Sequence, residues 1–301
     1  MKIGLMLPVG DGESNGYAGL RAMALAAEES GLDSIWAADH LIFRDGDTVE
    51  GLHESWTVLS ALAEATSRVE LGPMVLALPF RNPALTAKMA AELDEVSNGR
   101  LILGVGCGWH EPEFEAFGYP FDHRVSRFEE ALQITVPMLR EGTVTFEGRY
   151  HRAIDAELLP RPVRAGGPPI LIAGKQPRML ELVARFADQW NAAWFGHPDE
   201  ADELHRRLAN LRRALDAADR DPSTLDITVG ISIACSDGDS DAPDNAIRGS
   251  TGQIADALAA YHPLDARHLI AHVYPPIPDS VRRYGEAAAV ARDRIGAAST
   301  A

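Results

Sequence analysis

The sequence predicts an α/β fold of the (β/α)8 barrel class, also called a TIM barrel. Eight short apolar runs rich in β-branched residues are each followed by a segment of helical periodicity, as in parallel strands joined by helices. Eight such units in 301 residues suit a closed barrel. An open doubly wound sheet, which fewer repeats would suit better, is the alternative. No linker divides the chain, so residues 1–301 are expected to form one domain.

The elements follow one another in regular alternation. The expected strands lie near Lys2–Pro8, Ser34–Ala38, Val69–Leu76, Leu101–Val105, Ile170–Ala173, Gln189–Ala193, Asp226–Ala234 and His268–Val273. The expected helices lie near Tyr17–Ser30, Glu54–Ser67, Ala84–Ser97, Val125–Glu141, Pro177–Ala187, Asp199–Ala218, Thr251–Tyr261 and Ser280–Ile295. Asp199, Ser250 and Asp279 stand where N-caps belong, and Gly31 and Gly99 stand where helices should end.

Residues 142–169 interrupt this alternation. They contain Val144–His151, which alternates like a small hairpin, followed by a return rich in proline and glycine. We expect an insertion between the fourth helix and the fifth strand that covers the mouth of the barrel. A polar run at Ser236–Asn245 predicts a mobile loop after the seventh strand.

The composition excludes several classes of partner. A net charge of −16 disfavours nucleic acid and anionic membranes, since both bind basic surfaces. No run of about 18 apolar residues is present, so no membrane span is predicted. The two cysteines, Cys107 and Cys235, form no disulfide or metal-binding pattern, which favours a reducing cytoplasm.

The fourth strand leads into a glycine-rich turn, Gly104–Gly108, that would let backbone approach a ligand. Trp109, His110 and Glu113 follow at once, and His110 and Glu113 share one short helical turn. We therefore expect these three residues to line a substrate-binding wall. An ordinary tight turn with solvated side chains is the alternative, because glycine turns are common.

His40 is the candidate acid or base. It follows the second strand directly, at the end of a barrel where catalysis takes place, and an imidazole suits proton transfer near neutral pH. Asp39 is its expected orienting partner. A histidine that only hydrogen-bonds a loop is the alternative. A metal site is not expected, because no second ligand stands at a suitable spacing from His40.

The fifth strand ends in Ala173-Gly174, and a helix begins near Pro177, which is typical of an anion cradle. Lys175 or Arg178 would add charge; a glycine-ended turn with solvated basic side chains is the alternative. Trp109 and Trp194 fall in mouth loops and are candidates for stacking on a planar ring or for packing a lid. Neither a dinucleotide-binding Gly-x-Gly-x-x-Gly nor a P-loop is present.

Several motifs resemble the luciferase-like flavin or deazaflavin oxidoreductases. They are Asp39-His40-Leu41, Arg81-Asn82-Pro83, Gly99-Arg100-Leu101, Gly104-Val105-Gly106-x-Gly108-Trp109, Arg124-x-x-Arg127 and Pro169-Ile170-Leu171-Ile172-x-Gly174. The resemblance implies a (β/α)8 barrel with an insertion after the fourth helix, which binds either FMN or coenzyme F420 and often forms a homodimer. It also implies that His40 is the active-site histidine and that the Met74–Val75 bond is a cis peptide behind the cofactor ring.

The cofactor contacts implied by the resemblance, or by position at the mouth, come from Asp39, Met74, Val75, Cys107, Gly108, Trp109, Arg124, Ala173, Gly174, Lys175, Gln176 and Trp194. Two residues depart from the family pattern. Pro73 replaces the usual threonine before the bulge. Trp109 stands where sugar-phosphate dehydrogenases of this family carry glutamate, which argues against a sugar phosphate as substrate.

Coenzyme F420 carries a phosphodiester and an oligoglutamate tail, so it needs a locally basic groove on this acidic protein. The basic residues expected near the mouth favour F420: Arg81, Arg124, Arg127, Lys175 and Arg178. The expected function is hydride transfer between F420 and a small organic substrate, with a proton supplied through His40. An FMN-dependent monooxygenase is one alternative, and a catalytically silent cofactor-binding homologue is another.

Overall fold

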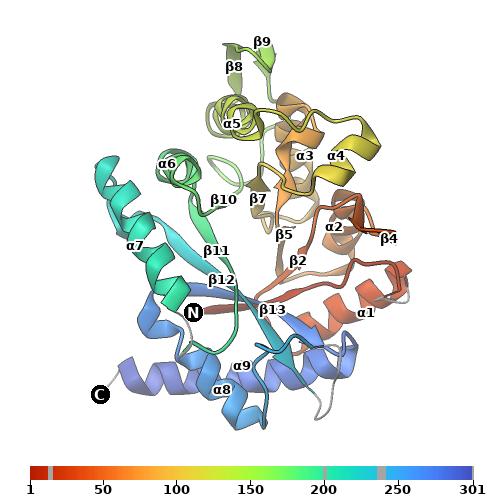
Figure 1. Cartoon of the computed structure of the whole chain (residues 1–301), viewed down its shortest axis with the longest axis vertical. Coiled ribbons are helices and arrows are strands. Elements are labelled where there is room, and N and C mark those ends of the chain that lie inside the picture. Colours follow the sequence, from red (N-terminus) through yellow and green to blue (C-terminus); the bar gives the residue numbers. More distant parts are fainter. Residues whose placement is uncertain (13–15, 199–201, 236–241, 300–301) are drawn as a thin grey trace.

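The computed structural model describes residues 1–12, 16–198, 202–235 and 242–299. Parallel strands form a barrel that is surrounded by helices (Figure 1). The strand order in the sheet is β5-β2-β1-β13-β12-β11-β10-β7-β6. Residues 236–241, which belong to the predicted polar loop, and the predicted cap Asp199 lie outside the described residues.

The strands of the barrel are β1 (Lys2–Met6), β2 (Ser34–Ala37), β5 (Glu70–Pro73), β6 (Leu76–Ala77), β7 (Leu103–Gly106), β10 (Ile170–Ala173), β11 (Gln189–Phe195), β12 (Asp226–Ala234) and β13 (Ala266–Tyr274). The helices are α1 (Gly16–Glu29), α2 (Ser55–Ala65), α3 (Pro83–Val96), α4 (Glu111–Phe117), α5 (Arg124–Glu141), α6 (Pro177–Phe186), α7 (Asp202–Ala217), α8 (Thr251–Ala259) and α9 (Pro278–Ser299). Short 3-10 turns are η1 (Leu78–Phe80), η3 (Pro222–Thr224) and η4 (His262–Leu264).

The predicted third strand is divided into β5 and β6 around Met74 and Val75, whose peptide bond is cis. Strand β7 joins both halves. Its approach contacts β5, where the Leu71 N–H donates to the Arg100 carbonyl, and its end pairs with β6. The predicted (β/α)8 barrel is therefore confirmed, and the third of its eight predicted strands is divided into β5 and β6.

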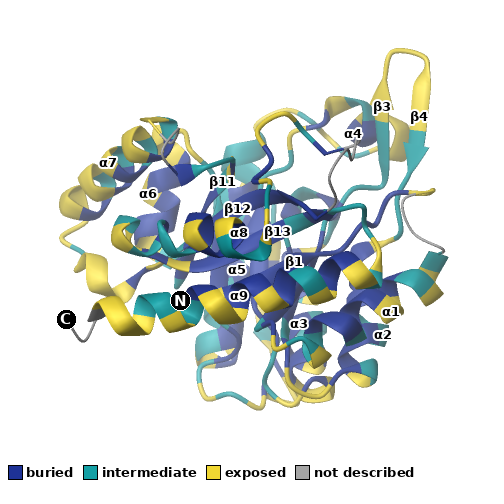
Figure 2. Ribbon diagram, turned by 90° about the horizontal axis from the view of Figure 1, so that it is seen from below, coloured by how far each residue is buried: buried dark blue, intermediate teal, exposed yellow. Residues whose placement is uncertain are grey.

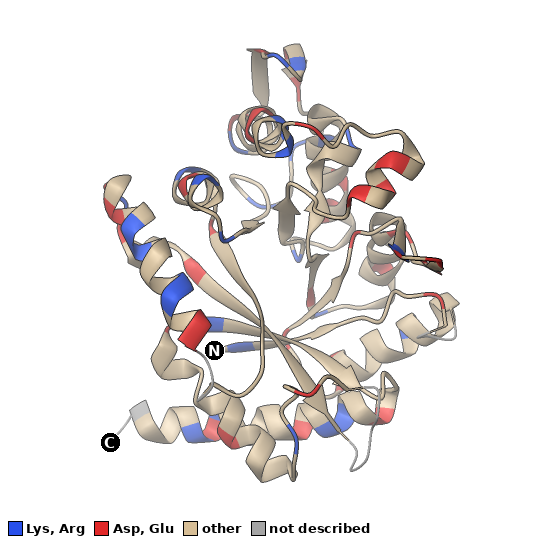
Figure 3. Ribbon diagram, in the orientation of Figure 1, with Lys and Arg blue, Asp and Glu red and all other residues tan. Residues whose placement is uncertain are grey.

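The helices are amphipathic around the barrel. Figure 2 shows buried strands and helices whose outward faces are exposed. Most charged residues lie on helices and loops (Figure 3). Ser250 is the N-cap of α8, as predicted, and it forms a capping box with Gln253. Gly31 and Gly99 have positive φ values of 76° and 77°. Asp279 lies inside α9, which begins at Pro278, so it is not the cap.

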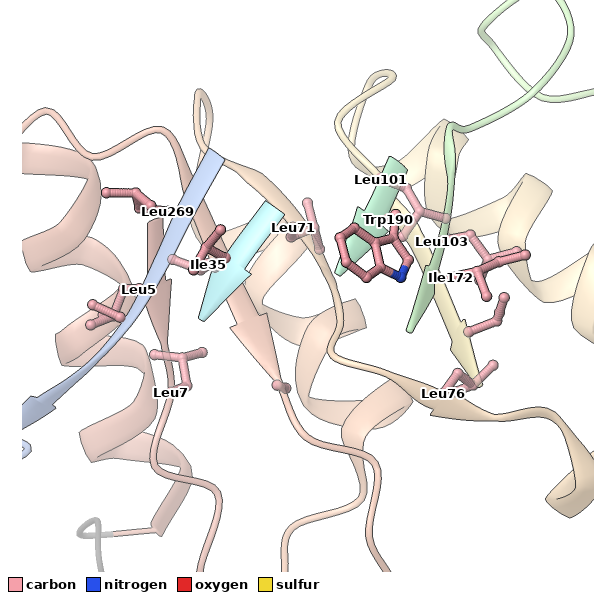
Figure 4. Close-up of a cluster of buried hydrophobic side chains, with 14 of the residues drawn as sticks. Leu5, Leu7, Ile35, Leu71, Leu76, Leu101, Leu103, Ile172, Trp190 and Leu269 are labelled. Atoms are coloured by element: carbon pink, nitrogen blue, oxygen red, sulfur yellow. The ribbon is translucent and has the colours of Figure 1, made fainter. Parts of the chain in front are cut away.

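Successive strand residues point to two buried layers. Leu5 and Ile35 pack in the outer layer beneath the helices, part of which Figure 4 shows. Their neighbours Met6 and Trp36 belong to a separate inner cluster with Ile102, Leu171 and Ile270. Because both faces are buried, the strands are apolar without alternation, and the barrel interior is filled below its mouth.

Residues 142–169 contain the hairpin of β8 (Thr143–Glu147) and β9 (Arg152–Glu157). Glu130 of α5 accepts hydrogen bonds from the backbone N–H groups of residues 149–151, so the hairpin lies along α5. Arg164 binds Asp94 and the Leu101 carbonyl, before β7 begins. The expectation that this insertion covers the mouth is corrected, because α5 returns the chain to the amino ends of the strands.

Two elements lie at the mouth in addition to the predicted strands and helices, and only a short helical turn at the start of the second was expected. The hairpin of β3 (Ile42–Asp45) and β4 (Thr48–Gly51) follows β2. Helix α4 follows β7 and contacts β3. Both are short insertions between a strand and its following helix, which is where a barrel places functional loops.

Candidate active site

A cavity of about 880 Å³ lies at the carboxyl ends of the strands. Its walls include fourteen of the predicted site residues: Asp39, His40, Met74, Val75, Cys107, Gly108, Trp109, Glu113, Arg124, Ala173, Gly174, Lys175, Gln176 and Trp194. Apart from Arg124 of α5, these residues lie at the ends of β2, β5, β7, β10 and β11 or in the loops after them, so distant parts of the chain come together in one place. The volume falls in the range of small-molecule and cofactor sites.

His40 is held by Glu113 of α4. The His40 Nδ1 lies 3.0 Å from Glu113 Oε1, and the Leu41 N–H donates to Glu113 Oε2 at 2.9 Å. The Glu113 side chain is 1% exposed and that of His40 is 20% exposed. A hydrogen bond from Nδ1–H to the carboxylate leaves Nε2 for proton exchange in the cavity.

Asp39 is not the partner of His40, which corrects the expectation from the sequence. Its carboxylate binds the Arg81 guanidinium through both oxygens, at 2.7 and 2.8 Å, and accepts the Ala77 N–H. The largest effect on the pKa of Arg81 is burial, which lowers it, but the hydrogen bonds to Asp39 prevail and the pKa is raised. Asp39 and Arg81 therefore fasten β2 to the segment after β6.

His110 does not line the cavity, which corrects its expected role as a substrate-binding residue. It is 7% exposed, and its Nε2 accepts the Arg44 N–H. Its ring stacks on Phe43 with centroids 4.6 Å apart and an interplanar angle of 4°. His110 therefore fixes the β3–β4 hairpin against α4, and Phe43 is brought to the cavity instead.

Arg124 begins α5 and donates to the Gly108 carbonyl at 2.6 Å. Its guanidinium also lies 4.0 Å from the centroid of Phe121. Burial raises the pKa of the neighbouring Cys107 thiol, which is therefore neutral at neutral pH. This loop thus presents backbone and a cation to the cavity, with no thiolate.

Fewer basic residues line the cavity than expected. Arg81, Arg127 and Arg178 do not line the cavity, and they bind Asp39, Asp122 and Glu129, respectively. Arg207 of α7 does line it and donates to the Ala192 carbonyl. Arg207 could not be predicted as a site residue, because it lies within an amphipathic helix far from any strand end.

His272 is a second residue that the sequence analysis missed as a site residue. It lies near the end of β13, and its ring is 4.6 Å from that of Trp194. Burial lowers the pKa of His272 to about 4, so the imidazole is neutral at neutral pH. Position at a strand end, the rule that found His40, would also have found His272.

The segment after β10 has the expected form of an anion cradle. Helix α6 begins with Pro177, and no side chain caps it, so its first N–H groups remain available to another acceptor. Lys175 and Gln176 are exposed at the rim of the cavity. A Cβ on Gly174 would lie 2.7 Å from the Cβ of Met179, so this glycine is required by packing inside the protein.

The described residues form neither a metal centre nor a membrane-spanning helix. Within residues 1–12, 16–198, 202–235 and 242–299, no group of three histidine, cysteine or carboxylate side chains is arranged to hold a metal ion. Over the same ranges, no helix has the length and apolarity needed to cross a membrane. The cavity at the mouth, with the His40–Glu113 pair in its wall, is the candidate active site.

Several known proteins are similar to this chain in sequence. An F420-dependent glucose-6-phosphate dehydrogenase of Amycolatopsis mediterranei is 32% identical over 241 residues, which cover 76% of this chain and 69% of the relative. A phthiodiolone/phenolphthiodiolone dimycocerosates ketoreductase of Mycobacterium bovis is 35% identical over 225 residues. That match covers 68% of this chain, and the chain spans only 58% of the ketoreductase.

Solved structures share the fold. An F420-dependent secondary alcohol dehydrogenase in complex with an F420-acetone adduct superposes with a TM-score of 0.80 at 19% identity, covering 97% of this chain and 99% of the other. An oxygenating constituent of 3,6-diketocamphane monooxygenase from Pseudomonas putida, in complex with FMN, has a TM-score of 0.72 at 18% identity, covering 95% and 96%. The family described as luciferase-like monooxygenase matches residues 1–301. The chain belongs to this luciferase-like family.

Proposed function

We propose that this protein is an F420-dependent oxidoreductase in which His40 exchanges a proton with the substrate oxygen. The observation that carries the proposal is the His40–Glu113 pair at the wall of the large cavity. The F420-dependent dehydrogenase that is 32% identical supports the choice of cofactor.

The cavity fits a planar cofactor with a phosphate tail. Met74 and Val75 line its wall, and a Cβ on Gly106 would lie only 2.8 Å from Val75 Cγ2. The glycine therefore allows the end of β7 to approach Val75 closely. Arg124, Lys175 and the first turn of α6 would hold the phosphate. When bound, reduced F420 supplies a hydride, which is equivalent to a proton and two electrons.

The residues of the chain would supply the remaining proton. In the reduction of a ketone, the imidazolium of His40 donates a proton from Nε2 to the carbonyl oxygen while the carbonyl carbon accepts the hydride. Glu113 stabilises the imidazolium through Nδ1–H. In the opposite direction, neutral His40 accepts the proton of the alcohol.

The test is a titration of the purified protein with F420 and with FMN, followed by absorbance and fluorescence. We expect saturable binding of F420 and much weaker binding of FMN. An FMN-dependent monooxygenase is the second candidate, because an FMN-bound neighbour shares the fold and the matched family is described by that activity. Tight binding of FMN alone would overturn the proposal, and F420 binding without turnover of any carbonyl compound would favour the silent homologue.

A further inference from the structure

The walls of the cavity differ in charge. The cations Arg124, Lys175 and Arg207 come from the side built by α5, β10 to α6, and α7. The wall built by the end of β1 and the β3–β4 hairpin is lined by Leu7, Val9, Gly10, Phe43, Glu50 and Leu52. No cation lines this second wall among the described residues, and the undescribed stretches of the sequence contain no lysine or arginine.

Glu50 is placed beside the candidate acid or base by the register of the hairpin. Phe43 and Glu50 are directly paired across β3 and β4, so their side chains project from the same face, with Cβ atoms about 5 Å apart. Both line the cavity. The Phe43 ring in turn contacts His40 edge-on, with centroids 6.0 Å apart. The Glu50 carboxylate therefore lies next to Phe43, whose ring contacts His40.

The Glu50 carboxylate is partly exposed and makes no hydrogen bond or ion pair with another described residue. Arg44 of the same hairpin is paired with Val49, so its side chain projects from the other face. The same hairpin also carries Asp45 and Asp47, and its acidic positions are visible in Figure 3. A substrate bound between His40 and this wall would share the cavity with the Glu50 carboxylate.

We propose that Glu50 is a specificity-determining residue that rejects anionic substrates, so that the site takes an uncharged, largely apolar ketone or the corresponding alcohol. This inference rests on the proposed function, because the ketone class follows from hydride transfer. Phe43, Leu52 and Trp109 would contact the apolar part of the substrate. In this partly shielded cavity, the repulsion between the Glu50 carboxylate and a carboxylate on the substrate would weaken binding of that substrate by about tenfold or more.

The experiment compares two ketones of similar shape, 4-methylcyclohexanone and 4-oxocyclohexanecarboxylate, by calorimetric titration of the F420-loaded protein at pH 7.5. We expect wild type to bind the neutral ketone at least about tenfold more tightly than the anion. Glu50→Gln should bring the two dissociation constants to within about threefold, mainly by tightening the anion. Asp47→Asn removes the same charge from the turn of the same hairpin, away from the cavity, and should leave the ratio unchanged.

The salt dependence of binding to the wild-type protein provides a second test of the repulsion by Glu50. Raising the salt concentration to 0.5 M should narrow the ratio in wild type, because the repulsion is screened. The inference is overturned if wild type binds both ketones equally or neither, or if Glu50→Gln changes the ratio no more than Asp47→Asn. If the protein fails to bind F420 while the cofactor-free protein still shows the Glu50-dependent ratio, the proposed function fails and the selectivity of the wall stands.

Discussion

At the scale of single residues, the chemistry of the site depends on which atom His40 presents. Glu113 is buried and accepts hydrogen bonds from His40 and from the Leu41 N–H, so the ring orientation is fixed from one side. A carboxylate at this position favours the tautomer with the proton on Nδ1. Nε2 is then free to exchange protons in the cavity.

We predict that His40→Ala keeps its affinity for F420 but loses turnover by about 10²-fold or more, the usual contribution of a positioned acid or base.

Glu113→Gln should lower turnover by about tenfold and shift the pH profile of turnover. The reason is that a glutamine oxygen facing the Leu41 N–H turns the NH₂ group toward Nδ1, which reverses the tautomer. Steady-state kinetics from pH 5 to 9 would measure both effects.

The matched control is Glu111→Gln, an exposed residue on the same helix. It should leave both turnover and the pH profile unchanged. Turnover of Glu113→Gln equal to that of the control, at an unchanged melting temperature, would assign Glu113 to packing alone.

At the scale of elements, the connection between β10 and α6 separates two roles that the sequence could not separate. Gly174 is enclosed by Met179, whereas Lys175 is exposed at the rim. The glycine therefore serves the packing of α6 on its strand, and the lysine is available for a phosphate.

We predict that Lys175→Ala weakens F420 binding by about fivefold with an unchanged melting temperature, because only an exposed cation is lost. Gly174→Ala should instead lower stability by about 1–3 kcal/mol through overpacking against Met179. Fluorescence titration and thermal unfolding would measure the two effects. Lys88→Ala, which removes a lysine from α3 outside the cavity, is the control; equal cofactor affinity in both lysine variants would place the phosphate elsewhere.

At the scale of the whole molecule, two histidines of β13 are shielded from water to different degrees, His268 inside the barrel and the half-buried His272 at the cavity. His268 lies below the mouth, where its Nε2 is 2.7 Å from Ser34 Oγ, which also accepts the Trp36 Nε1–H. Burial lowers the pKa of His268 to about 3 and that of His272 to about 4. Both are neutral in the folded protein and regain an ordinary pKa near 6.5 on unfolding.

We predict that the free energy of unfolding falls as the pH falls from about 6.5 toward 4. In this window the unfolded chain binds protons that the folded barrel does not, so each histidine costs about 1.4 kcal/mol per pH unit. Urea unfolding at pH 7, 6 and 5 would measure the slope, above the range in which carboxylates titrate. His272→Gln should remove about half of it, and a flat stability profile from pH 7 to 5 would contradict the prediction.

The barrel and the location of its site could be predicted from the sequence. Eight apolar runs and eight helical segments favoured a closed parallel sheet over an open one, and the ends of those runs, together with the family resemblance, named fourteen residues of the cavity wall. Local chemistry was also sufficient for the N-cap at Ser250 and the helix ends at Gly31 and Gly99. These features depend on periodicity and on interactions between residues close in the chain.

The partners of the charged groups could not be predicted, because they depend on how distant parts of the chain pack. Glu113 reaches His40 across 73 positions, whereas the adjacent Asp39 faces Arg81. Arg207 reaches the cavity from the middle of a helix, and residues 142–169 lie along α5 away from the mouth. Hydrogen-bond partners are chosen by the direction and distance of side chains after the strands have paired, and neighbours in the sequence that point to opposite faces of a strand do not meet.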